Sequence, residues 1–172
     1  THSESQGSSF GRDFSYEWIA GVIIGSFNHT SSGAAYTHLT SENITLEAGS
    51  EVSVSLTPGF ASLTFDEYWK IWIDYNGDGD FDDKNELVFD AGSLSKNTVN
   101  GTMNILTTAS GTTKMRVSMK YNGAQTANEA IQYGEVEDYT VVFGDAIPDN
   151  EAPSIPSGLS ASSITKSRAI IT

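Results

Sequence analysis

Short stretches in which polar and apolar residues alternate recur along the chain and predict β-strands. A period of two is typical of a strand with one buried face. It is clear over Glu51–Leu56 and Thr113–Lys120. Five further apolar segments are predicted as strands: Trp18–Phe27, Ile44–Leu46, Tyr68–Tyr75, Leu87–Asp90 and Val136–Phe143. No segment has convincing helical periodicity.

Turns are predicted where glycine follows proline or asparagine, or precedes serine, because these residues suit tight turns. Such pairs are Gly49-Ser50, Pro58-Gly59, Asn100-Gly101 and Asn122-Gly123. Many short strands with frequent turns are typical of an all-β fold. The pattern therefore predicts an antiparallel β-sandwich, jelly-roll-like in its connections, with a calcium-binding loop argued below.

The composition changes near Asp145 and divides the chain. Residues 145–156 contain three of the four prolines, and this is typical of an extended linker. Pro153–Thr165 resembles the opening strand of a fibronectin type III module. We therefore predict a flexible N-terminal segment at 1–13, a sandwich domain at 14–144, a linker at 145–156, and the truncated start of a second module at 157–172. This organisation favours a modular parent protein.

The most informative segment is acidic and runs from Asp74 to Glu86 (DYNGDGDFDDKNE). Calcium takes six to eight oxygen ligands, and it favours carboxylates spaced along a tightly turning loop. The spacing resembles an EF-hand up to Asp80, but the twelfth position is Asn85 and the preceding segment reads as a strand. The sequence therefore predicts a structural Ca²⁺ site between strands. The expected ligands are Asp74, Asn76, Asp78, Asp80 and Glu86, with Asp82 or Asp83 in reserve. The alternative is an acidic surface loop that binds no ion.

Charge and residue content narrow the partners. Twenty-two acidic residues stand against nine basic ones, for a formal charge of −13. Such a chain repels nucleic acid and anionic membranes, so neither is expected as a partner. There is no cysteine, which excludes disulfides and thiolate metal sites. No apolar run is long enough for a membrane-spanning helix.

A second acidic motif lies at Tyr133–Val141. Alternation places Glu135 and Glu137 on one face of a strand, opposite Val136. The pair could act as a glycosidase acid and base, complete a cation site, or form hydrogen bonds to loops. Two carboxylates alone specify little, and we assign no catalytic residue.

Gly134–Asp138 spells GEVED, and the surrounding segments resemble the GEVED domain family. The similar segments are Tyr16–Ile19, Tyr68–Asn76, Asp78–Phe81 and Met115–Met119. The resemblance covers about residues 14–143. It implies a β-sandwich accessory domain of secreted bacterial peptidases, glycoside hydrolases and adhesins, often beside fibronectin-like modules. Localisation is therefore expected to be secreted or at the cell surface. Many members carry cysteines, which this chain lacks, so disulfide stabilisation does not transfer to it.

Alternation also predicts which side chains point outward on two strands. Trp69, Ile71 and Ile73 share an apolar, inward face, as do Met115, Val117 and Met119. The outward side chains are Tyr68, Lys70, Trp72, Lys114, Arg116, Ser118 and Lys120. If the two strands are neighbours, they form a basic, aromatic face suited to an anionic, for example sulfated, polysaccharide. The alternative is that a loop covers Trp72 and the basic residues balance nearby acids.

The loop from Tyr121 to Tyr133 is a second candidate ligand surface, because tyrosines and amides commonly contact sugars. Three functions are weighed. The first is a non-catalytic carbohydrate-binding module that holds a catalytic domain of the same parent chain on its polysaccharide. The second is a structural spacer or adhesion module of a secreted peptidase or surface protein, with no sugar ligand. The third is a lyase or glycosidase that uses Glu135 and Glu137.

Overall fold

The computed structural model describes residues 9–34 and 36–144, which form ten strands and no helix. The strands are β1 (Phe10–Asp13), β2 (Glu17–Ile24), β3 (Phe27–Thr30), β4 (Tyr36–Glu47), β5 (Glu51–Phe60), β6 (Glu67–Ile73), β7 (Leu87–Asp90), β8 (Val99–Asn104), β9 (Thr112–Tyr121) and β10 (Ala130–Gly144). The described residues contain no helix long and apolar enough to cross a membrane.

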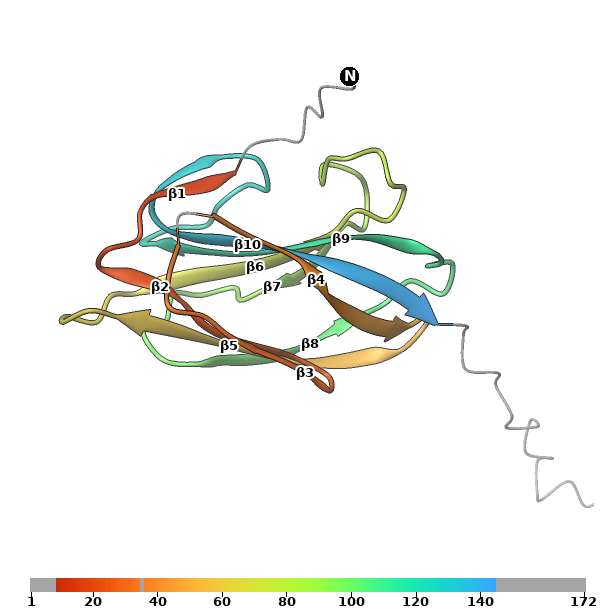
Figure 1. The fold of residues 1–172 in the computed structure, drawn as a ribbon, viewed down its shortest axis with the longest axis horizontal. Helices are drawn as coiled ribbons and strands as arrows, with labels where there is room; N and C mark the ends of the chain where they lie inside the picture. Colours follow the sequence, from red (N-terminus) through yellow and green to blue (C-terminus); the bar gives the residue numbers. More distant parts are fainter. Residues whose placement is uncertain (1–8, 35, 145–172) are drawn as a thin grey trace, which may run out of the picture.

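The strands form two sheets that pack face to face (Figure 1). The larger sheet has the order β1-β10-β9-β6-β7, and β4 also pairs with β10. The smaller sheet has the order β3-β2-β5-β8. The prediction of an all-β sandwich is confirmed, because each sheet contributes its apolar face to a shared core.

The core lies between the sheets and follows the alternation read from the sequence. Trp69, Ile71 and Ile73 of β6 are all fully buried, and so are the three inward side chains predicted for β9. Ile19 of β2 and Leu56 of β5 belong to the same cluster. Period-two alternation therefore identified the buried face of β6 and β9 correctly.

Two strands depart from the predicted antiparallel arrangement. β1 pairs with Ala130–Tyr133 of β10, and β4 pairs with Val136–Gly144, both in parallel. At fifteen residues, β10 is long enough for both strands to lie along one of its sides. Residues 10–13, which belong to the segment expected to be flexible, form β1 in this ladder.

Two of the four predicted turns are wrong, because their glycines serve close packing within strands. Pro58-Gly59 lies in β5 and Asn100-Gly101 lies in β8. A side chain at position 59 would collide with the Trp18 ring, and a Cβ at position 101 would lie 2.5 Å from Phe89 Cε2. Strand glycines often mark such close approaches. The turns at Gly49-Ser50 and Asn122-Gly123 are confirmed. The expected linker and fibronectin-like segment lie outside the described residues.

Candidate ligand pocket and acidic loop

The acidic loop (residues 74–86) connects β6 to β7 at one end of the larger sheet. Two buried carboxylates hold it in shape from within. Asp74 accepts hydrogen bonds from the backbone N–H of Gly77 at 2.7 Å and of Gly79 at 3.1 Å. Glu86 accepts from the N–H of Tyr75 at 2.9 Å and of Asp83 at 3.2 Å. Burial raises the pKa of Glu86, and these two hydrogen bonds oppose that rise.

A second group of carboxylates gathers on the outer side of this loop. Oxygen atoms of Asp78, Asp80 and Asp83 all lie within 4.8 Å of one another. The Asn76 amide nitrogen donates to Asp78 at 2.9 Å and to Asp83 at 2.5 Å. Of the predicted ligands, the structure thus brings Asp78 and Asp80 together with Asp83 from the reserve pair. Asp74 and Glu86 are separate from this group because they bind loop backbone.

The acidic loop is fastened to the sheet by a buried ion pair. Arg116 of β9 donates two hydrogen bonds, each 2.7 Å long, to Asp138 of β10, and a third at 2.8 Å to the Ala127 carbonyl. Its guanidinium lies 4.8 Å from the centre of the Phe81 ring, which belongs to the loop. Phe81, Trp72 and Ala127 form a small apolar cluster around it. Asp138 of the GEVED motif therefore supports the loop through Arg116.

The expected basic, aromatic face is not open to solvent, although β6 and β9 are neighbours as that expectation required. Trp72 is only 4% exposed and Arg116 only 2%, because the acidic loop and the segment around Ala127 cover them. Lys70 pairs with Asp90 at 3.6 Å and Lys120 with Glu129 at 2.5 Å. This surface therefore fits the alternative interpretation, in which loops cover Trp72 and nearby acids balance the basic residues.

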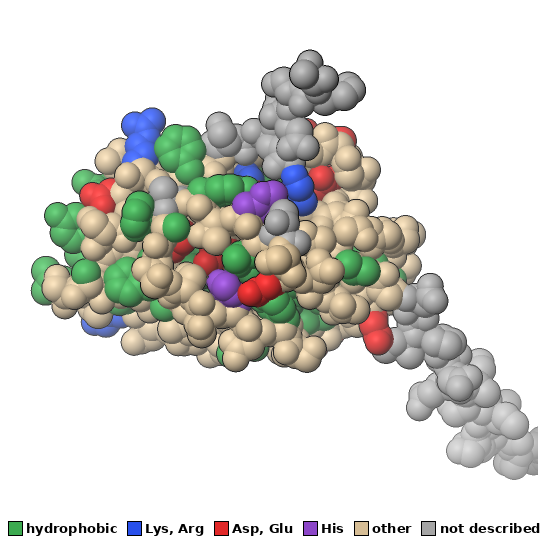
Figure 2. All heavy atoms as spheres, viewed as in Figure 1, with side chains coloured by type: hydrophobic (Ala, Val, Ile, Leu, Met, Phe, Trp, Pro, Cys, Tyr) green, Lys and Arg blue, Asp and Glu red, His purple; other side chains and the backbone are tan. Residues whose placement is uncertain are grey.

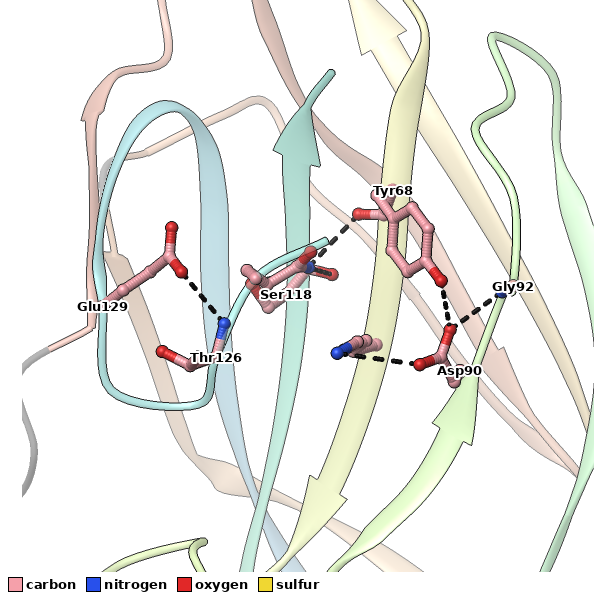
Figure 3. A network of polar contacts seen from close by, with 8 residues as sticks. Tyr68, Asp90, Gly92, Ser118, Thr126 and Glu129 are labelled. Carbon is pink, nitrogen blue, oxygen red and sulfur yellow. Dashed lines mark hydrogen bonds and ion pairs between the residues drawn. The ribbon is translucent and has the colours of Figure 1, made fainter. Parts of the chain in front are cut away.

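Loop fastening on the outside of β6 and β9 is visible in Figure 3. The Tyr68 hydroxyl donates to Asp90 at 2.6 Å, and the backbone N–H of Gly92 donates to the same oxygen. The Gln125 amide donates to the carbonyls of Ser118 at 2.8 Å and Tyr68 at 3.2 Å. The segment after β9 therefore lies across the two strands. This further reduces the surface that a polymer could reach.

Glu135 and Glu137 share a face, as predicted, and that face is the interior of the sandwich. Glu135 accepts hydrogen bonds from the N–H of Ile19 at 2.8 Å and of Ala34 at 2.9 Å. Glu137 accepts one from the Tyr139 hydroxyl at 2.5 Å. Burial raises the pKa of Glu137 to about 7. Burial likewise raises the pKa of Glu135, and its hydrogen bonds oppose that rise. Both carboxylates are fully buried. Because Ile19 belongs to the smaller sheet and Glu135 to the larger one, the hydrogen bond between them bridges the two sheets.

The described residues form an aromatic pocket at the other end of β6 from the acidic loop. We use this name for the cavity lined by Tyr16, Glu17, Phe65, Tyr121 and Tyr133, with a volume of about 290 Å³. Rings of Phe65 and Tyr121 meet edge to face at 5.7 Å, and those of Tyr121 and Tyr133 at 6.3 Å. Figure 2 shows hydrophobic side chains at this end, where β1 leads into β2.

Sequence reasoning found part of this pocket. Tyr121 and Tyr133 were predicted as ligand contacts, since both flank an amide-rich loop. Tyr16, Phe65 and Glu17 were missed because they come from distant segments that meet only in the fold. Tyr16 could have been identified from the sequence, because an aromatic residue just before a strand can contribute to the rim of a sandwich.

Two buried carboxylates lie near each other at this end of β6. Glu17 of β2 lines the aromatic pocket and is 2% exposed, and Glu67 of β6 is fully buried and interacts electrostatically with Glu17. Neither oxygen of Glu67, nor Oε1 of Glu17, has a hydrogen-bond partner among the described residues. Burial, and then the nearby charges of Glu17 and Asp66, raise the pKa of Glu67 to about 8. Burial raises the pKa of Glu17 as well, and Asp13 adds to the rise.

Comparison with known proteins yields one family. The sequence model of the GEVED domain family matches residues 68–142, which run from β6 into β10. No curated protein matches the chain. The matched segment contains the acidic loop, the Arg116–Asp138 pair and the buried motif glutamates. It also contains Tyr121 and Tyr133, whereas Tyr16, Glu17 and Phe65 precede it.

Proposed function

We propose that this chain is a non-catalytic polysaccharide-binding module of a larger secreted or cell-surface protein, with the aromatic pocket as its sugar site. The observation that carries the proposal is a cavity with four aromatic walls. Tyr16, Tyr121 and Tyr133 are each at least 40% exposed, so their rings are available to a ligand. Sugar rings present C–H faces that pack on aromatic side chains, and hydroxyl groups that bond to tyrosine and carboxylate oxygens.

The aromatic pocket replaces the outer face of β6 and β9 as the proposed contact surface. A cavity of about 290 Å³ lies at the lower limit of small-molecule sites and accommodates roughly one sugar ring. On the outer face, Trp72 and Arg116 are covered. Preference for an anionic polymer also loses its support, because Lys70 and Lys120 are paired with carboxylates. We still propose that this binding holds a catalytic domain of the same parent chain on its polysaccharide.

We further propose that the acidic loop binds Ca²⁺ and that the ion has a structural role. Asp78, Asp80 and Asp83 offer carboxylate oxygens within reach of one ion, as a hard cation prefers. Rotation of the Asn76 amide by a half turn would present its oxygen in place of its nitrogen, which now faces two aspartates. Asp74 and Glu86 would then position the loop without binding the ion themselves.

Burial of the motif glutamates supports the absence of catalysis. A glycosidase needs its two carboxylates at an open cleft on either side of the scissile bond. Glu135 and Glu137 are instead enclosed between the sheets and bound to protein groups. Incubation with polysaccharides should release no new reducing ends. Release that is lost in Glu137→Gln would contradict this part of the proposal.

The function is tested by affinity electrophoresis against neutral, sulfated, carboxylated and amino polysaccharides. We expect at least one polymer to retard the protein. Tyr133→Ala should abolish the retardation, because it removes one wall of the pocket. Tyr68→Ala is the matched control, since Tyr68 lies on the outer face and not in the pocket.

Two other outcomes of the electrophoresis would contradict the proposal. Loss of retardation in Tyr68→Ala but not in Tyr133→Ala would assign binding to the outer face and refute the pocket. Failure of every polymer to retard the protein would refute sugar binding and leave the spacer or adhesion module as the function.

A further inference from the structure

Neither oxygen of Glu67, nor Oε1 of Glu17, has a hydrogen-bond partner among the described residues. Buried polar groups are almost always hydrogen-bonded, because a buried carboxylate without a partner is strongly unfavourable. Glu67 faces the space between the sheets, as do Trp69 and Ile71 on the same strand. Glu17 lines the pocket itself. Two such groups, close enough to interact electrostatically, indicate a site that a bound ligand completes.

The local charge indicates the sign of the missing group. Glu17 and Asp66 each disfavour the ionised form of Glu67, and Asp13 does the same for Glu17. None of the interactions that shift these two glutamates comes from a lysine or arginine among the described residues. A bound cation would let both glutamates ionise and would be attracted by all four carboxylates.

The walls of the pocket select among cations. Aromatic faces attract ammonium groups, because the ring face carries partial negative charge. Calcium is less suited, because it needs six to eight oxygen ligands and four of the five lining residues are aromatic. An ammonium group needs only a carboxylate and an apolar surround.

We propose that the aromatic pocket binds a protonated amine carried on a sugar ring, so that the ligand is a polysaccharide with free amino groups. This inference rests on the proposed function and narrows its substrate class. An amino sugar unites the two features of the pocket: its ring face packs on Tyr121 and Tyr133, and its ammonium group reaches Glu17. A bare alkylammonium chain would fill much less of a cavity of about 290 Å³.

The test compares a short glucosamine oligosaccharide with its N-acetylated counterpart by calorimetry, near neutral pH and at raised ionic strength. Acetylation removes the charge and keeps the sugar ring. We expect the free amine to bind roughly tenfold or more tightly, as for a charge-assisted hydrogen bond. Glu17→Gln should lower the affinity for the free amine by a similar factor, so that the variant binds the two oligosaccharides about equally.

Two controls address folding and non-specific attraction to an acidic protein. Glu51→Gln removes an exposed carboxylate at the start of β5. Glu17 pairs with Phe60 at the opposite end of that strand, so Glu51 serves as a remote control for net charge. Binding that falls equally in Glu51→Gln and Glu17→Gln would reflect net charge alone and would overturn the inference. Glu17→Gln preserves the shape of the side chain and removes a buried charge, so unfolding in urea should show no loss of stability.

The remaining outcomes separate the inference from the function. Equal binding of both oligosaccharides, or retardation by neutral or anionic polymers alone, overturns the amine and leaves sugar binding intact. Direct binding of hexylammonium, with no binding of either oligosaccharide, would assign the pocket to another amine source and overturn the sugar. If none of these probes binds, both the inference and the pocket assignment fail.

Discussion

Gly134 has a φ of +128° and lies against the backbone of β9, where a Cβ would overlap the Met119 carbonyl oxygen. Any side chain would face both an unfavourable backbone conformation and a steric clash. Gly134→Ala should therefore lower the free energy of unfolding by about 3 kcal/mol or more, as measured by urea denaturation. Gly123→Ala is the control, because position 123 has open space and an ordinary φ. Equal effects in the two variants would contradict this explanation.

Burial of Glu67 should give the protein an unusual dependence of stability on pH. Its pKa in the folded protein is about 8, against 4.5 for an unburied glutamate. Between these values the unfolded chain ionises while the folded protein keeps its proton. Stability is therefore lost as pH rises from about 4.5 to 8.

Glu67→Gln should remove this loss. The variant should match the unsubstituted protein near pH 4 and exceed its stability by roughly 2–4 kcal/mol near pH 8. Urea denaturation across this range is the measurement. Glu51→Gln, at an exposed position, should show no such trend. A stability difference for Glu67→Gln that does not grow with pH would exclude Glu67 as the titrating group.

At the scale of single residues, alternation predicted which side chains share a face but not what covers that face. Glu135 and Glu137 were placed together correctly, and so were Lys70, Trp72 and Arg116. Whether a face is solvent or interior depends on loops and on the opposing sheet. The acidic loop covers Trp72 through Phe81, and this contact joins positions that carry no common sequence pattern.

Among pairs of elements, the link between β9 and β10 through Arg116 and Asp138 should be sensitive to substitution. Both side chains are at least 97% buried, so removal of one partner leaves an uncompensated charge. Asp138→Asn should cost about 3 kcal/mol of stability or more. The double variant Arg116→Met with Asp138→Asn should be more stable than the sum of the single effects predicts.

A partly exposed ion pair between β9 and the loop before β10 provides the control for that cycle. Lys120 and Glu129 are partly exposed, so Lys120→Met should change stability by at most about 1 kcal/mol. Thermal and urea unfolding of the four variants gives the comparison. Additive effects at Arg116 and Asp138 would show that the pair is not coupled.

Elements with regular alternation were predicted well, and the exceptions have physical causes. Leu87–Asp90 matches β7 in full, and Thr113–Lys120 lies within β9. β1 and the parallel pairing of β4 were missed because pairing between distant segments leaves no local pattern. Pro58 was read as a turn, but it lies beside a register shift in the β2–β5 ladder, where a strand tolerates proline.

For the whole molecule, the acidic loop and the aromatic pocket lie at opposite ends of β6. Calcium at the loop should therefore stabilise the fold without changing affinity at the pocket. At an excess of about a hundredfold over its Kd, Ca²⁺ should add about 2.7 kcal/mol and raise Tm by several degrees. Differential scanning calorimetry with Ca²⁺ and with chelator is the measurement.

Variants within the loop sharpen the calcium test. Asp78→Asn and Asp83→Asn should abolish the response, because both residues belong to the carboxylate group. Asp82→Asn should retain it, since Asp82 lies outside that group and bonds to Asn128. An unchanged Tm in chelator would refute the calcium site and leave the pocket proposal standing.

The parallel ladder between β1 and β10 has a mechanical consequence. Tension applied between Phe10 and Gly144 would pull these strands past each other, so that the hydrogen bonds of β1 to residues 130–133 bear load simultaneously. Sequential rupture, as in unzipping, needs far less force. Single-molecule pulling from these two positions should therefore give a higher rupture force than pulling from Phe10 and Ala130, which lie side by side at the same end of the ladder. Equal forces in the two geometries would refute shear resistance.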